Sequence, residues 1–218
     1  MLKLTWMRRR SLAVAGACAA TLCTAAPALA ADPPPPPSNG PAAVMAKVTW
    51  GSTLECAAPQ YAQTLAGFGD RRWYVQAPGG DFSSASAGGW QFSGGASLVA
   101  DSHDGDALDL PAGSVAVSPA MCVDLSYPTA RMWARNVSGK ANVNVGVAYA
   151  GTKTATAPHW VGGLKPASSA WTLSKDFAVQ PQTAGKADGW RMVAFVFVAD
   201  KGGDARIDDF YVDPRFRT

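Results

Sequence analysis

The spacing of short apolar runs from Gly88 onward most constrains what this sequence can fold into. Runs rich in Val, Ile, Phe, Tyr and Trp alternate there with Gly, Pro, Asn and Asp turn signals every eight to twelve residues. No stretch of convincing length carries the 3.6-residue period of a helix. Several short strands at this spacing predict an all-β chain, and specifically an antiparallel β-sandwich.

Individual strands can be located from the same pattern. In "GWQFSGGASLVA" (89–100) the Gly-Gly pair indicates a bulge or a bend between two strand pieces. The run "RMVAFVFV" (191–198) is apolar on both faces, so we expect a central strand that is covered twice. The opposite sheet covers one face of this strand. The other face is covered by the 42–80 segment, by a partner protein, or is open to solvent. Further strands are expected at 106–113, 114–118, 120–125, 170–180 and 205–213.

A hairpin is predicted where "TARMWARN" (129–136) and "ANVNVGVAY" (141–149) flank "VSGK". In the second strand, valines alternate with asparagine or glycine, which assigns to the core Val143, Val145 and Val147. If Asn136 pairs with Ala141, two residues of the first strand share that inner face, namely Met132 and Ala134. A register different by one residue would bury the neighbouring tryptophan instead.

The same register gathers an outer-face group of one aromatic ring, two cations and two amides: Trp133, Arg131, Arg135, Asn142 and Asn144. An aromatic platform with such polar neighbours is suited to an anionic or hydroxyl-rich saccharide. In the alternative, Trp133 packs beneath the 42–80 segment while the arginines pair with aspartates. Trp160, which we expect in a Gly-rich loop, is a second ligand-binding candidate of the same kind.

Residues 1–30 have the three parts of a secretory signal peptide. A basic region with Lys3 and Arg8–Arg10 precedes an apolar run, and Ala28 and Ala30 frame a small-residue cleavage site. We therefore expect a secreted, extracellular mature chain. One alternative is a membrane span, for which the apolar run is short. The other is a lipoprotein, which would need a leucine three residues before one of the signal cysteines, and neither cysteine has it.

The rest of the chain divides into three zones. The stretch "ADPPPPPSNGP" (31–41) predicts an extended, proline-rich linker. Residues 42–80 scatter aromatic residues among Gly, Ala and Pro, so we expect an irregular segment that packs on the domain. Residues 81–218 are assigned to the β-sandwich domain itself.

The signal peptide accounts for the formal net charge of +3. It holds four of the 19 basic residues and none of the 16 acidic ones, which leaves 15 basic against 16 acidic residues. A near-neutral exported chain lacks the polybasic surface that nucleic acids and anionic membranes attract. We expect no nucleic-acid partner and no membrane span after cleavage, and the oligomeric state stays open.

Two of the four cysteines leave with the signal peptide, so the exported chain keeps Cys56 and Cys122. An even pair in an oxidising setting predicts a disulfide. Closing the intervening loop stabilises a chain by roughly 4 kcal/mol in the chain-entropy account. A metal site would need further ligands and a catalytic thiol would need a base, and neither stands near these cysteines in the sequence.

The acid and base residues argue against hydrolysis. Glu55 is the only glutamate in the chain, so a two-carboxylate glycosidase would have to rely on aspartates. No nucleophile elbow, zinc-binding H-E-x-x-H or phosphate-cradling glycine motif appears. We expect the chain not to be an enzyme.

A resemblance to known modules is carried by "GGDFSSASAGGWQFSGGASL", followed by "AWTLSKDFAV", "GWRMVAFVFV" and "ARIDDFYVDP". Over about residues 79–214 the chain resembles jelly-roll carbohydrate-binding modules and galactose-binding-like domains. More narrowly, "LPAGSVAVSPAMCV" with "IDDFYVDP" resembles secreted proteins of unassigned function from high-GC bacteria. The resemblance implies a jelly-roll sandwich that recognises carbohydrate or a cell-envelope polymer. The alternative is a structural or protein-interaction module of the cell surface without a small ligand.

The last predicted strand carries two adjacent carboxylates, Asp208 and Asp209, of which at most one can face open water. In the resembled modules, an acidic residue near the first strand and an aspartate of the last strand meet at a structural calcium ion. The resemblance implies that role for Asp208 or Asp209 with Asp81, although Ser83 stands where the pattern has glutamate. In the alternative, one aspartate is solvated and the other accepts hydrogen bonds from the backbone or Arg206.

Overall fold

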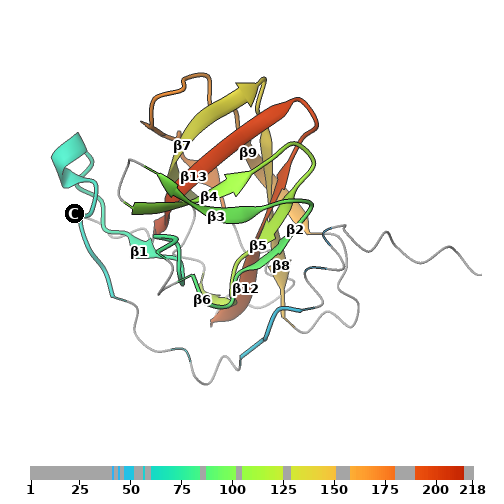
Figure 1. Cartoon of the computed structure of the whole chain (residues 1–218). Coiled ribbons are helices and arrows are strands. Elements are labelled where there is room, and N and C mark those ends of the chain that lie inside the picture. Colours follow the sequence, from blue (N-terminus) through green and yellow to red (C-terminus); the bar gives the residue numbers. More distant parts are fainter. Residues whose placement is uncertain are drawn as a thin grey trace, which may run out of the picture. The chain divides into compact units, whose positions relative to one another are not determined.

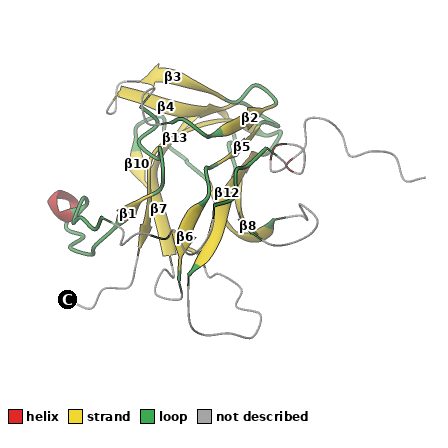
Figure 2. Ribbon diagram, turned by 90° about the horizontal axis from the view of Figure 1, so that it is seen from below, coloured by secondary structure: helices red, strands yellow, loops and turns green. Residues whose placement is uncertain are grey.

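The computed structural model describes residues 41, 44, 47–51, 56, 60–83, 87–101, 105–124, 129–150, 158–179 and 190–213, which all belong to one compact unit, 35–218. Across these residues, thirteen strands form two antiparallel sheets, and a short 3-10 helix, η2 (Ala66–Phe68), lies outside them (Figure 2). The predicted all-β class is therefore confirmed. The predicted signal peptide and residues 31–40 of the predicted linker lie outside the described ranges. No helix within those ranges has the length and hydrophobicity that crossing a bilayer requires.

Seven of the described strands form the first sheet: β1 (Val75–Gln76), β3 (Ser97–Asp101), β4 (Gly105–Leu110), β7 (Thr129–Gly139), β10 (Thr172–Leu173), β11 (Phe177–Ala178) and β13 (Gly203–Asp213). Neighbours follow the order β10-β7-β13-β4-β3, while β1 pairs with β13 and β11 pairs with β7. Figure 1 shows β7 and β13 side by side. Because β1 lies within the segment 42–80, that segment is not irregular throughout and adds a short strand to this sheet.

Six described strands form the second sheet: β2 (Gln91–Ser93), β5 (Val115–Val117), β6 (Met121–Val123), β8 (Val143–Tyr149), β9 (His159–Leu164) and β12 (Arg191–Ala199). Neighbours follow the order β2-β5-β12-β8-β9, and β6 also pairs with β12. The bend predicted at the Gly-Gly pair is present, because Gly94 and Gly95 both have positive φ, at 64° and 93°. This turn carries the chain from β2 in the second sheet to β3 in the first.

The predicted hairpin between β7 and β8 is wrong, although the faces assigned to its residues are right. β7 pairs with β13, β10 and β11, whereas β8 pairs with β12 and β9 in the other sheet. The inner faces of both sheets nevertheless meet in one core, so alternation buries the same side chains in either arrangement. The residues assigned to this core are buried there: Met132, Ala134, Val143, Val145 and Val147.

Strand β12 is covered on both faces, as its sequence predicts. One row of its side chains, Val193, Phe195 and Phe197, belongs to the core between the sheets. The opposite row includes Ala194 and Val196, which pack in a second apolar cluster with Val115, Val117, Ala148 and two residues of the N-terminal segment, Val44 and Val48. Residues of the segment 42–80 therefore supply the second cover of this strand.

A β-bulge in β13 explains its two adjacent carboxylates. The pairing with β7 shifts register between Asp208 and Tyr211, and Asp209 has a φ of 50°. Because the bulge changes which residues face inward, both Ile207 and Phe210 reach the core and are fully buried. Asp208 stays on the outer face but is only 1% exposed, and its carboxylate accepts a hydrogen bond from the Asp209 backbone N–H at 2.8 Å.

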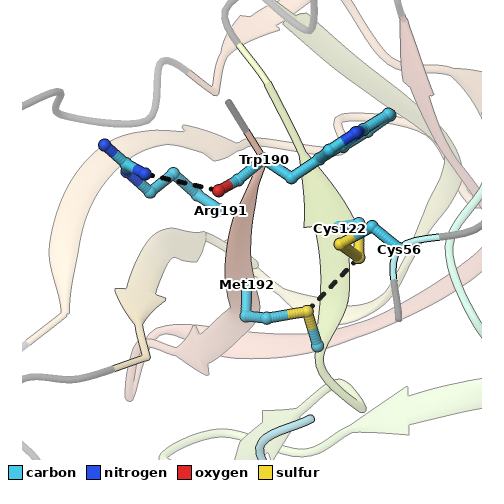
Figure 3. The surroundings of a disulfide bond; sticks show 5 residues. All are labelled: Cys56, Cys122, Trp190, Arg191 and Met192. Atoms are coloured by element: carbon cyan, nitrogen blue, oxygen red, sulfur yellow. Dashed lines mark hydrogen bonds between the residues drawn. A yellow bond between two sulfur atoms is a disulfide. The ribbon is translucent and has the colours of Figure 1, made fainter. Parts of the chain in front are cut away.

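The predicted disulfide between Cys56 and Cys122 is present (Figure 3). Cys122 lies in β6, where it pairs with Met192 of β12, and the Met192 Sδ is 3.3 Å from the Cys122 Sγ. The bond links the second sheet to the same N-terminal segment that carries Val44 and Val48. The disulfide thereby attaches the N-terminal segment to the second sheet near β12, whose outer face this segment covers.

Candidate functional site

The three predicted site residues of β7 lie on the outer face of the first sheet, but side chains of the N-terminal segment and aspartates occupy their surroundings. The Trp133 ring meets the Phe68 ring edge-on, with centroids 4.9 Å apart. Phe68 belongs to η2, which is part of the segment 42–80. Trp133 therefore packs beneath this segment, as in the alternative derived from the sequence.

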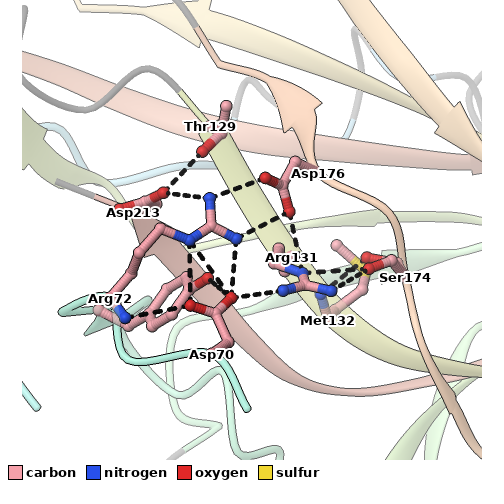
Figure 4. Close-up of polar contacts among 9 residues, drawn as sticks. Asp70, Arg72, Thr129, Arg131, Met132, Ser174, Asp176 and Asp213 are labelled. Atoms are coloured by element: carbon pink, nitrogen blue, oxygen red, sulfur yellow. Dashed lines mark hydrogen bonds and ion pairs between the residues drawn. The ribbon is translucent and has the colours of Figure 1, made fainter. Parts of the chain in front are cut away.

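Arg131 belongs to a network of ion pairs that links β7 to the loops around it (Figure 4). Its Nη1 lies 2.6 Å from the Asp70 carboxylate, and its Nε lies 3.0 Å from that of Asp176. Arg72 also binds both of these carboxylates and reaches Asp213 of β13 at 2.9 Å. This network satisfies the Arg131 charge inside the protein and leaves it poorly suited to a ligand.

The Asp70 carboxylate is stabilised in its charged form. The pKa of Asp70 lies well below its usual range, mainly because Arg72 donates hydrogen bonds to the carboxylate. The Tyr74 hydroxyl, which donates at 2.6 Å, lowers this pKa further, whereas partial burial raises it. Burial is also the main cause that raises the pKa of the Tyr74 phenol. Asp213 differs, because burial raises the pKa of its carboxyl.

The lowered pKa of Asp70 predicts a loss of stability in acid. A carboxyl whose pKa is lower in the folded than in the unfolded state stabilises the folded protein at pH values above the unfolded-state pKa, about 4. This stabilisation is lost as the pH falls through the folded-state pKa. We expect the unfolding free energy of Asp70→Asn to fall less between pH 6 and pH 3 than that of the wild type, as measured by urea denaturation. Equal losses in both proteins would contradict this. Asp213→Asn is the control, because the raised pKa of Asp213 predicts the opposite sign.

Arg135 takes part in a second network on the same face. The Asp101 carboxylate, whose side chain is 1% exposed, binds Arg135 Nη2 at 2.7 Å and Arg206 Nη1 at 2.8 Å. The same carboxylate accepts a hydrogen bond from the Trp171 Nε1–H at 2.8 Å, and the Arg135 guanidinium lies over the Trp171 ring, 5.5 Å from its centroid. As a result, Arg135 is also held by the protein.

Asn142 and Asn144 lie on the other sheet, so the sequence-derived group of five is divided. Asn144 projects from the outer face of β8, since the alternating valines face the core, and Asn142 directly precedes this strand. Their Nδ2 atoms donate to the two oxygens of Asp200, with Asn144 Nδ2 at 2.7 Å from Oδ1 and Asn142 Nδ2 bound to Oδ2. Asp200 thus fixes the orientation of both amides, and within the described residues neither amide oxygen accepts a hydrogen bond.

Trp160 lies in strand β9 and not in the predicted loop, and it stands on the same outer face as these amides. It pairs with Gly146 across the edge of the sheet, while Gly163 pairs with Asn144 on the same two strands. A Cβ atom at Gly146 would lie 3.1 Å from the Trp160 Cε3, so the indole rests on the glycine backbone. Trp160 is nevertheless 53% exposed. One part of the indole is supported by β8, and much of the rest is open to solvent.

The structure therefore brings together three of the six predicted ligand-binding residues, namely Trp160, Asn142 and Asn144. We call this group the Trp160 face. Sequence reasoning did not assign Gly146 or Asp200 to it. The glycine that interrupts the row of asparagines in β8 was a usable signal, because a missing side chain in a strand often marks close approach of another group. The position of Asp200 depends on the pairing of β12 with β8, which the sequence pattern does not specify.

The three aspartates predicted as calcium ligands are not grouped. No cluster of three or more His, Cys, Asp or Glu residues that could hold a metal ion occurs in the described ranges. The Asp81 carboxylate accepts a hydrogen bond from the Ser83 backbone N–H at 3.3 Å, and Asp209 Oδ1 lies 3.4 Å from Gln76 Nε2. Calcium binding stays a prediction for which these side chains supply no shared site.

Comparison with known proteins gives a likeness to solved structures but no family. No family profile and no curated protein matches the chain. A family 61 carbohydrate-binding module in complex with β-1,4-galactotriose is 19% identical over 64% of this chain and 96% of its own, with a TM-score of 0.41. The family 11 module of the Clostridium thermocellum cellulase Lic26A-Cel5E is 13% identical over 74% and 99%, with a TM-score of 0.39. The C-terminal family 6 module of a laminarinase from Zobellia galactanivorans is 13% identical over 54% and 87%, with a TM-score of 0.37.

These structural neighbours are carbohydrate-binding modules, the class that the sequence resembles. Their identities are too low to transfer the role of any residue. The narrower resemblance to secreted proteins of high-GC bacteria stays a prediction.

Proposed function

We propose that this protein is a secreted, non-catalytic module that binds carbohydrate at the Trp160 face. The observation that carries the proposal is the half-exposed indole of Trp160, which rests on Gly146 beside two amides held by Asp200. An aromatic ring supported from one side offers its other side to the C–H surface of a sugar. Asn142 and Asn144 lie next to it and can bond to sugar hydroxyls.

The polar half of the site supports recognition of hydroxyl groups. Trp160 pairs with Gly146, and Asn144 is the next outer-face residue of β8 beyond Gly146, so the ring and the amide are neighbours on this face. A sugar ring stacked on the indole would thus bring its substituents within reach of the amides. Because Asp200 already orients both amide groups, little side-chain freedom would be lost on binding.

Two further observations support a secreted, non-catalytic role. The N-terminal thirty residues have the composition of an export signal. At the Trp160 face, the Asp200 carboxylate is engaged by two amides and so acts as a positioning group. A carboxylate held in this way orients its partners and is poorly placed to transfer a proton to a ligand.

Replacing Trp160 with alanine is expected to weaken carbohydrate binding about tenfold, because the variant loses both the apolar area that a sugar would bury on the indole and the stacking itself, which contributes about 0.5–1.5 kcal/mol in aromatic pairs. The measurement is retention on a panel of immobilised or soluble polysaccharides, followed by titration calorimetry with the polymer that is retained best. Trp73→Ala is the matched control, since Trp73 is another exposed tryptophan, at 40%, that lies near β1 of the first sheet.

A second variant tests the geometry of the platform. In Gly146→Ala, the added Cβ would lie 2.8 Å from the Pro158 Cβ and 3.1 Å from the Trp160 Cε3. Pro158 must therefore shift and the indole must give way slightly, so binding should fall while the indole itself remains. Unchanged polysaccharide affinity in Trp160→Ala would contradict the proposed site. If the wild type retains no polysaccharide at all, the structural or protein-interaction alternative takes its place.

A further inference from the structure

Two adjoining hollows open beside the Trp160 face, and lysines line them. The first, of about 500 Å³, lies between the segment that follows β9 and strands β10 and β11, and it is lined by Lys165 and Lys175. The second, of about 520 Å³, is lined by Lys140 and again by Lys165. Both hollows share the stretch Lys165–Ala167, so they meet at Lys165. We call the two hollows together the lysine groove.

Three lysines and one aspartate are the charged residues that line the lysine groove. Within the described ranges no ion pair involves Lys140, Lys165 or Lys175. The one carboxylate among the lining residues, Asp176, is already bound by two arginines. Four arginines of the described chain have aspartate partners, whereas the three lysines of the groove remain available to an external anion.

The lysine groove is continuous with the Trp160 face. Asn142 belongs to that face and also lines the second hollow. Gly163 lines the first hollow, and a Cβ placed on it would lie 3.6 Å from the Oδ1 atoms of both Asn142 and Asn144. A polymer that stacks on Trp160 and contacts the amides would therefore enter the groove with its next residues.

We infer that the ligand of this protein is an acidic polysaccharide, whose sugar rings engage the Trp160 face while its carboxylate or sulfate groups bind Lys140, Lys165 and Lys175. This inference rests on the proposed carbohydrate-binding function and names the substrate class of the same site. Lysine suits such a ligand, because its flexible ammonium group binds anionic groups without the fixed geometry that a guanidinium imposes. A neutral polysaccharide would leave three unpaired cations along its path.

The test compares polymers that differ in charge alone. Polygalacturonate is paired with its methyl ester, and dextran sulfate with dextran, in titration calorimetry at low and at physiological ionic strength. We expect tighter binding of at least one acidic polymer than of its neutral counterpart, and weaker binding of that acidic polymer as salt rises. Each lysine-to-glutamine change at positions 140, 165 and 175 should weaken acidic-polymer binding about two- to fivefold at low salt. Arg71→Gln is the control, since it removes an exposed charge that lines neither hollow.

The outcomes of this experiment distinguish failure of the inference from failure of the proposed function. If neutral polymers bind through Trp160 as tightly as acidic ones, the inference is wrong and the proposed function stands. A further outcome is that poly-glutamate binds as tightly as the acidic polysaccharides and that Trp160→Ala changes the affinity for neither polymer. In that case the inference and the proposed function are both wrong, because the groove recognises charge without sugar. If a variant with all three lysines changed to glutamine binds an acidic polysaccharide as tightly as the wild type, the inference is also wrong. It is likewise wrong if the wild type binds neither acidic polymer.

Discussion

Replacing Asp101 with alanine is expected to lower the free energy of unfolding by about 3–5 kcal/mol, the usual effect of removing one partner from a buried ion pair. The Asp101 side chain is 1% exposed and binds Arg135, Arg206 and the Trp171 indole N–H. Its removal leaves two guanidinium groups and one indole donor without their shared acceptor. Urea denaturation monitored by tryptophan fluorescence measures the loss.

Asp109→Ala is the matched control for this prediction. Asp109 also binds Arg206, at 2.8 Å, but its side chain is 19% exposed and its removal leaves Arg206 paired with Asp101. We expect a loss of about 1 kcal/mol or less, as for pairs near solvent. If the two aspartate variants lose the same stability, Asp101 is not the centre of this network.

Phe210→Ala should destabilise the protein by about 3–5 kcal/mol, because a fully buried phenylalanine leaves a cavity when it is truncated. The Phe210 ring meets those of Phe195 and Phe197 edge-on, with centroids 4.8 Å and 5.3 Å away. It reaches this position because of the bulge at Asp209. The fall in the urea midpoint at constant slope gives the size of the effect.

The exposed phenylalanine of η2 provides a comparison. Phe68 is 66% exposed, so Phe68→Ala removes a ring of the same size with little loss of buried area. We expect its midpoint to stay close to that of the wild type. A similar small effect for Phe210→Ala would mean that β13 continues without the bulge and points this ring to the outer face.

The sequence pattern located most strands and their faces, but it missed β1 and β9 and did not give the strand partners. Alternation assigned Val145 and Met132 to the core, and both are buried. The same alternation holds whether β7 and β8 pair with each other or lie in opposite sheets, because both inner faces meet in one core. Pairing is decided by contacts between distant segments, such as the register of β7 with β13, and no local pattern encodes these.

The candidate site shows the same limit. The predicted outer-face group assumed a β7–β8 hairpin. Because the two strands lie in different sheets, the group is divided between those sheets. Trp160, which was singled out from its own Gly-rich surroundings without a partner strand, keeps the exposure that a binding role needs. The role of Asp200 could not be predicted, since the aspartate becomes a neighbour of Asn142 and Asn144 only when β12 pairs with β8.

Strands β12 and β9 of the second sheet differ in how fully they are enclosed. At its centre, β12 is enclosed by the other sheet on one side and by Val44 and Val48 on the other, with a covalent link nearby at Cys122. At the edge, β9 has a strand neighbour on one side only, and most of its residues are exposed. Local opening is easier where few buried contacts hold a strand. We therefore expect the strand that bears Trp160 to open locally more readily than β12 does.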